Sequence, residues 1–134
     1  FVDSAGSVFL ITKSQGRPPV VYRIRADAWL TGRTATAEQV GTLPIDSGSL
    51  GSRVTDAALS PSGRVVAVRT YLAIYLFVLA ADGSLAPTGV ACDAAGLQLQ
   101  GEGITWLDER RLVLTSEGGF GTRGTVVVLG CGRD

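Results

Sequence analysis

The sequence contains no histidine, no methionine and no asparagine. Without an imidazole, this chain cannot build a Ser-His-Asp triad, and Ser4 and Ser116 have no base that would activate their hydroxyl groups. The missing imidazole and thioether also narrow the metal chemistry to oxygen ligands, which favour a hard cation such as calcium. The composition therefore excludes histidine-dependent hydrolases and histidine-ligated metal centres built from this chain alone.

Charge of either sign is not in excess, because 12 basic residues balance 12 acidic residues. No basic field is available to attract nucleic acid or anionic lipid, and we exclude nucleic acid as a partner. The longest apolar run, residues 71–81, is shorter than the roughly 20 residues that cross a bilayer, so we expect no membrane insertion. The chain opens with Phe1 and lacks methionine, and we expect it to be a processed or excised segment.

Cysteine is scarce, and the two that occur are Cys92 and Cys131. Two cysteines allow one intrachain pairing, and an even count fits a disulfide in an exported protein. The alternative is a pair of separate buried thiols, which behave as small apolar side chains. We predict the disulfide, and with it a secreted protein or one on the exterior of the cell envelope.

The sequence repeats itself three times, in residues 1–12, 58–69 and 105–116. Each copy has an apolar approach, a tight polar turn rich in Gly, Pro, Ser or Asp, and then an apolar strand. Val8, Val65 and Leu112 are equivalent and stand about 57 and about 47 residues apart, near the roughly 40–50 residues of a propeller blade.

Further segments rich in β-branched and aromatic residues follow each copy and predict additional strands. Innermost strands are expected at residues 54–59 and 101–106, but the first repeat retains only Phe1 and Val2 of its own. The remaining expected strands are residues 20–25, 39–43, 74–79, 85–92 and 125–129. Only residues 27–30 and 35–40 favour a helical turn.

The run of residues 65–68 lacks a clean alternation of apolar and polar side chains, which indicates a strand buried on both faces. We therefore predict an all-β fold of β-propeller blades: about two complete four-stranded blades and a partial first one, part of a six-bladed ring. Residues 1–134 form one segment, with blades at about 1–50, 51–93 and 94–134. A β-sandwich is the alternative. Because open sheets aggregate, we expect the remaining blades of the same protein, or a second copy, to complete the ring.

Residues 54–71, together with 100–106 and 114–118, resemble a group of uncharacterised six-bladed propeller proteins of actinobacteria, most of them exported. That group looks distantly similar to the "esterase-like activity of phytase" and gluconolactonase-type propellers. The resemblance implies that the chain is the C-terminal half of such a ring. It supplies no activity to carry over.

Glu102 stands between two glycines on an expected innermost strand. In gluconolactonase-type propellers, a Glu in a similar Glu-Gly context is a calcium or zinc ligand, and Glu117 and Asp56 would complete a calcium site here. Against this, the repeats align Glu102 with Thr55, and neighbouring residues on a strand point to opposite faces. The alternative is that these carboxylates line the channel or form structural hydrogen bonds.

The remaining polar and aromatic candidates have structural interpretations beside the functional ones. Lys13 and Arg69 either balance the carboxylates across a channel or form ion pairs that fix the register between blades. Trp106 and Phe120 are expected to pack between blades, with a sugar-stacking platform as the alternative. The glycine-dense segment 118–124 opens no helix, so we predict no phosphate cradle there.

The sequence thus predicts a non-catalytic scaffold that binds a ligand or a protein. The alternative is half of a metal-dependent, lactonase- or phosphoesterase-like enzyme whose site other blades or a second copy complete.

Overall fold

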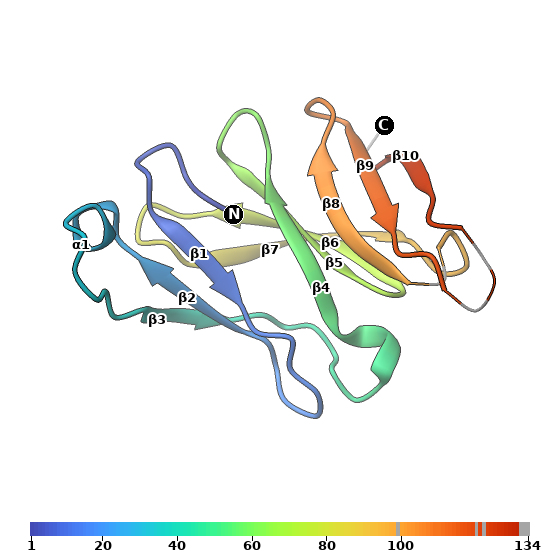
Figure 1. The fold of residues 1–134 in the computed structure, drawn as a ribbon, viewed down its shortest axis with the longest axis horizontal. Helices are drawn as coiled ribbons and strands as arrows, with labels where there is room; N and C mark the ends of the chain where they lie inside the picture. The colour runs from blue at the N-terminus through green and yellow to red at the C-terminus, as the bar shows by residue number, and fades with distance from the viewer. Residues whose placement is uncertain (99, 120, 122, 132–134) are drawn as a thin grey trace.

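The computed structural model describes residues 1–98, 100–119, 121 and 123–131, and its fold is all-β, as predicted. Three antiparallel sheets follow one another along the chain and stack side by side (Figure 1). The first holds β1 (Val8–Ile11), β2 (Val20–Ile24) and β3 (Glu38–Thr42). The second holds β4 (Val54–Leu59), β5 (Val65–Thr70), β6 (Ala73–Leu79) and β7 (Leu85–Asp93). The third holds β8 (Gly101–Trp106), β9 (Arg111–Ser116) and β10 (Val126–Gly130).

The hairpin turns are those that the repeat predicts. Gly63 adopts φ +72° in the β4–β5 turn, and its N–H donates to the carbonyl of Ser60 at 2.8 Å. Gly6 repeats this arrangement ahead of β1, with φ +84°. A positive φ costs glycine little, because it has no Cβ, so both positions favour a sharp reversal. In the third sheet the carboxylate of Asp108 holds the turn by accepting the backbone N–H groups of the two residues that follow Glu109.

The second sheet is buried on both faces. Val66 and Val68 face the first sheet and belong to a core with Phe9 and Val21. Ala67, between them, faces the third sheet in a second core. This explains why the run of residues 65–68 lacks alternation. Three stacked sheets with two separate cores also differ from the two sheets of a β-sandwich, which was the alternative prediction.

The three sheets have unequal numbers of strands in the described residues. Only the second has four, and the third has three among the described residues, with β10 at its edge, so the predicted second complete four-stranded sheet is not seen there. The sequence contributes outer strands β3 and β7 to the other two sheets, whereas Cys131 is the only described residue after β10. In the first sheet, the only pairing observed on the inner side of β1 in the described residues is one antiparallel bridge, between Val2 and Val8.

One of the two predicted helical turns is present as α1 (Ala26–Trp29), and a 3₁₀ turn, η1 (Leu50–Ser52), precedes β4. The other, at residues 35–40, is wrong. There β3 pairs with β2 from Glu38 onward, because cross-strand pairing outweighs a weak local preference for helix.

A β-bulge recurs on the inner strands of the second and third sheets. Val54 pairs with Thr70 and Asp56 with Arg69, so Thr55 is the extra residue. Gly101 pairs with Ser116 and Gly103 with Thr115, so Glu102 is the extra residue. The register therefore makes Thr55 and Glu102 equivalent, as the repeat alignment predicts. A bulge re-aims its side chain and often lies beside a functional site.

The predicted disulfide between Cys92 and Cys131 is present, with a Cα–Cα distance of 5.8 Å. It joins the outer strand β7 of the second sheet to the residue that follows β10 of the third. A bond of this kind is compatible with an extracellular protein. Across the described ranges, no helix has the length and apolar character needed to span a bilayer.

Candidate functional site

One side chain from each sheet meets in a polar network near the inner strands. Lys13 follows β1, Tyr71 follows β5, and Glu102 is the bulge residue of β8. The Lys13 ammonium lies 3.1 Å from the Tyr71 hydroxyl, which in turn donates to Glu102 Oε1 at 2.7 Å. Lys13 Nζ also lies 3.6 Å from Glu102 Oε2. The network therefore links all three sheets through one bulge.

The charges of this network balance each other at a partly exposed position. The hydrogen bond to Tyr71 raises the pKa of Lys13, and the charge of Glu102 adds to the effect, while desolvation opposes it. The side chains of Lys13 and Glu102 are 48% and 34% exposed. Solvent screens such a pair, so its contribution to stability is small. The ammonium also lies over the Tyr71 ring, 5.2 Å from its centroid.

Arg69 is the largest fully buried side chain of the described residues, at 1% exposure. Its Nη1 donates to the carbonyls of Gly103 and Thr115 at 2.7 and 2.9 Å, and its Nη2 donates to Gln98 Oε1 at 2.7 Å. Desolvation lowers the pKa of Arg69, and the charges of Glu102 and Asp56 counteract this. Arg69 thus reaches from β5 into the third sheet and binds backbone there.

The glycines on both sides of Glu102 have a packing cause. A Cβ at Gly101 would lie 1.7 Å from Arg69 Nη2, and a Cβ at Gly103 would lie 2.3 Å from Thr115 Oγ1. Both distances are far below any real contact, so a side chain at either position would displace Arg69 or Thr115. The Gly-Glu-Gly pattern, which resembles a metal-ligand context in sequence, therefore accommodates the buried Arg69 and Thr115.

The structure does not bring the three predicted calcium ligands together. Asp56 accepts the backbone N–H groups of Ala57 and Ile104, each at 2.8 Å, one on each carboxylate oxygen. Glu117 instead lines a separate pocket with Gln98 and Arg123. In the described part of the chain, which includes all three carboxylates, no group of three or more Asp, Glu or Cys side chains is placed to hold a metal ion. Calcium binding stays a prediction without geometric support.

Of the two aromatic candidates, the structure describes only Trp106. Trp106 packs in the second core and donates from Nε1 to the carbonyl of Ala58 at 3.0 Å, as expected for a side chain between sheets. Phe120 lies outside the described residues. The sequence-based interpretation missed Tyr71 and Gln98, which link the sheets through Glu102 and Arg69. The only signal for Tyr71 was that it directly follows the strand ending at Thr70, just as Lys13 closely follows the equivalent strand of the first repeat.

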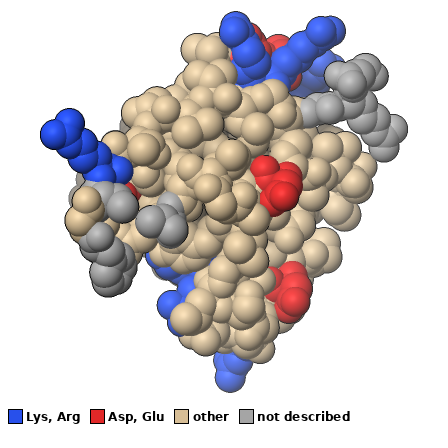
Figure 2. Space-filling model, turned by 90° about the vertical axis from the view of Figure 1, so that its right-hand side faces the viewer, with Lys and Arg blue, Asp and Glu red and all other residues tan. Residues whose placement is uncertain are grey.

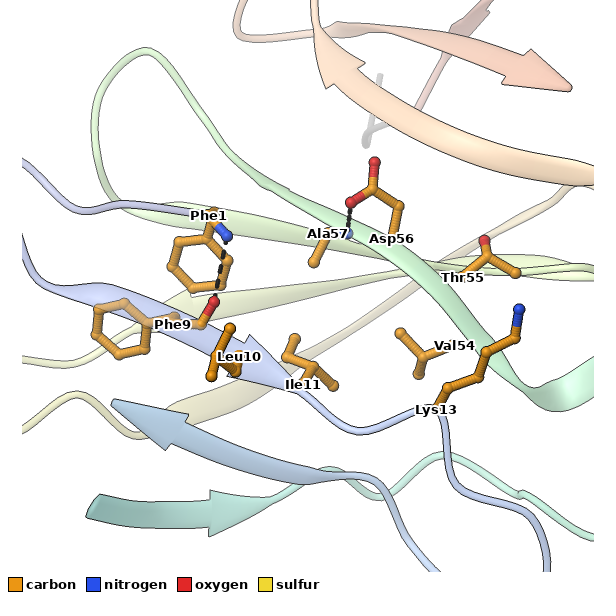
Figure 3. Close-up of a pocket in the computed structure, with 9 residues that line it drawn as sticks. All are labelled: Phe1, Phe9, Leu10, Ile11, Lys13, Val54, Thr55, Asp56 and Ala57. Atoms are coloured by element: carbon orange, nitrogen blue, oxygen red, sulfur yellow. Dashed lines mark hydrogen bonds between the residues drawn. The ribbon is translucent and has the colours of Figure 1, made fainter. Parts of the chain in front are cut away.

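A pocket of about 190 Å³ lies between β1 and β4, beside this network (Figure 3). Phe1 and Phe9, whose rings stack with centroids 4.8 Å apart, line it at one end. Lys13 and Thr55 line it at the other. The volume is smaller than the roughly 300–1,000 Å³ of small-molecule sites.

Comparisons of this chain with protein-family models, with curated proteins and with solved structures found no match in any of the three. The resemblance to the actinobacterial propellers therefore stays a prediction. Function has to be inferred from the geometry of the sheets.

Proposed function

We propose that the chain is a three-blade part of a β-propeller that serves, in an exported protein, as a non-catalytic scaffold for binding a ligand or protein. The stacking of the sheets is the observation that carries this proposal. Each sheet adds its strands outward in chain order, and the inner strands β4 and β8 each have a bulge at the equivalent position. Radial repetition of such sheets is the architecture of a propeller. The disulfide supports export, because such bonds persist in oxidising environments.

Exposed apolar side chains on the two end faces of the stack support the proposal that further sheets pack on either side. Val126 and Val128 of β10 are 70% and 55% exposed on the third sheet, and Leu10 is 50% exposed on the first. Their counterparts in the second sheet, such as Val68, are fully buried. Figure 2 views the molecule from the side of the third sheet, where uncharged residues cover most of the surface, acidic side chains lie within the face and basic side chains lie at its rim. Exposed apolar faces of this kind mark interaction surfaces.

A second copy of the chain fits both faces at once. In a six-sheet ring, the third sheet of each copy covers the first sheet of the other, and both contacts repeat the stacking already present within one chain. Such a head-to-tail contact closes on itself after two copies and leaves no open apolar face.

Light scattering tests this closure. We expect the mass of two chains for the wild type, and of one chain when Val126→Glu and Val128→Glu are combined. Leu30→Glu, a substitution at an exposed leucine near α1, is the matched control and leaves the mass unchanged. A wild-type monomer at the same concentration would contradict ring closure by two copies. A monomer that also binds no hydrophobic dye would contradict the proposal that these faces are normally covered.

A further inference from the structure

Tyr71 and Glu102 form a phenol–carboxylate pair at the junction of the second and third sheets. The Tyr71 hydroxyl donates to Glu102 Oε1 at 2.7 Å. Thr70, which is 1% exposed, fixes the turn that carries Tyr71, because its Oγ1 accepts the N–H of Ala73 at 2.9 Å and donates to the carbonyl of the same residue at 3.0 Å. Neither member of the pair belongs to the first sheet, so the placement of the pair is independent of that sheet.

Hydrogen bonds from the second sheet also fix the backbone beside Glu102. Arg69 donates to the carbonyl of Gly103 at 2.7 Å, and Asp56 accepts the N–H of Ile104 at 2.8 Å. Glu102 is the extra residue of the bulge on β8, and a bulge of this kind re-aims its side chain. The pair is therefore preorganised, which reduces the ordering cost that binding of a ligand has to overcome.

Lys13 indicates which chemical group this pair accepts. Its ammonium lies 3.1 Å from the Tyr71 hydroxyl, 3.6 Å from Glu102 Oε2 and 5.2 Å from the centroid of the Tyr71 ring. A hydroxyl oxygen, a carboxylate and an aromatic face together recognise an ammonium ion, through charge-assisted hydrogen bonds and a cation–π contact. The geometry around Lys13 is thus that of an ammonium site, which a side chain of the chain itself occupies.

Lys13 is held weakly in this site. Its side chain is 48% exposed and that of Glu102 is 34% exposed, so solvent reaches both charges and screens their attraction. Keeping a long lysine side chain in one conformation also costs entropy. Lys13 follows β1 in the first sheet, whose junction with the second is mainly apolar and therefore non-directional. An ammonium ion from solution can reach the pair while Lys13 turns away into water.

We propose that Tyr71 and Glu102 bind a primary ammonium group of a ligand, which takes the place of the Lys13 ammonium. Lys13 is an internal competitor that occupies the site in the absence of ligand. A primary ammonium fits better than a quaternary one, because the Tyr71 oxygen accepts an N–H that a quaternary group lacks. The proposal rests on the proposed scaffold function and names its ligand class. A free alkylamine and a lysine of a polypeptide share this chemistry.

Removal of the internal competitor is the first test. The Lys13→Met variant keeps an apolar side chain, and we expect it to bind n-butylammonium about fivefold more tightly than the wild type, because the fraction of free sites scales the apparent affinity. NMR of the Tyr71 ring and the Glu102 amide in the full chain measures binding. Tetramethylammonium at equal ionic strength is the control ligand and should bind more weakly. In the wild type, the signals of Lys13, the only lysine, should shift as the ligand displaces it.

Substitutions in the pair identify the groups that bind. In the Lys13→Met background, Glu102→Gln removes the charge but keeps the side-chain shape, and we expect affinity for n-butylammonium to fall about tenfold or more. Glu117→Gln, at an exposed carboxylate that lines a different pocket, is the matched control and should leave affinity unchanged. Tyr71→Phe keeps the ring, removes the hydroxyl and also weakens binding, which keeps the test decisive if Glu102→Gln fails to fold. Amide dispersion of each variant verifies its fold.

Two further ligands distinguish the sources of the ammonium group. The tripeptide acetyl-Gly-Lys-Gly-amide carries this group on a polypeptide, and its Nε-acetylated form lacks the charge and should not bind. Tighter binding of the tripeptide than of n-butylammonium would assign the site to a lysine of a partner protein. Equal or weaker binding of the tripeptide would assign the site to a free amine.

Several results would overturn the inference. These are no saturable shifts of Lys13→Met at tens of millimolar n-butylammonium, equal affinities of Lys13→Met and the wild type, an affinity unchanged by Glu102→Gln, or binding of tetramethylammonium as tight as that of n-butylammonium. The scaffold's ring closure fails separately, because it is read from the mass of the Val126→Glu, Val128→Glu variant in the absence of ligand.

Discussion

The second and third sheets are joined by hydrogen bonds and a disulfide, whereas the first and second sheets are joined mainly by apolar packing. At the former, Arg69 binds two carbonyls of the third sheet, Asp56 accepts the N–H of Ile104, and Trp106 binds the carbonyl of Ala58. A disulfide adds a covalent link at the outer edge. The first junction is mainly an apolar core, with polar links at its margins such as Arg23 to the carbonyl of Asp82.

The difference shows which strands carry directional contacts between sheets. Asp56 and Ala58 lie on β4, and Ile104 and Trp106 lie on β8, so two of these bonds join the inner strands directly, while Arg69 reaches across from β5. The first sheet has only Phe1 and Val2 on its inner side, and there β4 faces a pocket instead of a neighbouring strand. Apolar burial is non-directional and holds the sheets together, whereas the inner-strand hydrogen bonds fix how they sit.

Reduction of the disulfide should weaken the second junction most. The bridge closes a loop with a sequence separation of 39 residues, for which the chain-entropy relation gives about 4 kcal/mol of unfolding free energy. Urea unfolding with and without reductant measures this loss. The Cys92→Ser, Cys131→Ser double variant serves as the control and should not respond to reductant. Equal stability of the oxidised and reduced wild type would refute the expectation.

Arg69→Met should cost about 3 kcal/mol, because it leaves the carbonyls of Gly103 and Thr115 and the amide oxygen of Gln98 buried without their donor. Relief from burying the guanidinium charge offsets part of that cost. Arg111→Met is the matched control: it removes an exposed ion pair with Asp108 and should cost less than about 1 kcal/mol. Equal losses for the two variants in urea unfolding would argue against a buried register contact.

The smallest effect is expected from the network at Lys13, the only lysine of the chain. Its pKa is raised in the folded state, mainly by Tyr71. The stabilisation is thus fully present below the unfolded pKa of about 10.4 and disappears as pH rises through the higher folded value. An NMR titration of the single ammonium group measures the folded pKa. Tyr71→Phe should lower it, and an unchanged value in that variant would exclude the hydrogen bond as the main cause.

Local patterns in the sequence predicted the sheets well. Turn residues such as Ser60 and Gly63 set the hairpins, and the unalternating run of residues 65–68 indicated burial on both faces. Both signals involve neighbours in sequence, which is why they can be recognised without a structure. The alignment of Glu102 with Thr55 also held, because a repeated bulge keeps the same register in two sheets.

The contacts between sheets could not be predicted in the same way. Arg69 meets Gly103 and Thr115 across 34 and 46 residues, and Asp56 meets Ile104 across 48. Such pairs depend on how far each sheet is rotated against the next, which no periodicity in the sequence records. A charged residue in an apolar strand looked like a partner for carboxylates, whereas it is a donor to backbone carbonyls. The glycines around Glu102 suggested a metal-ligand context for the same reason, because the side chains that require them, Arg69 and Thr115, are distant in sequence.

The placement of the disulfide also decides how the chain would respond to a protease. Every strand of the third sheet lies inside the loop that Cys92 and Cys131 close. A single cut anywhere in that loop leaves both fragments covalently joined until reductant is added. A cut in the connection between β3 and β4 has no such restraint, and only noncovalent contacts would then hold the first sheet to the other two.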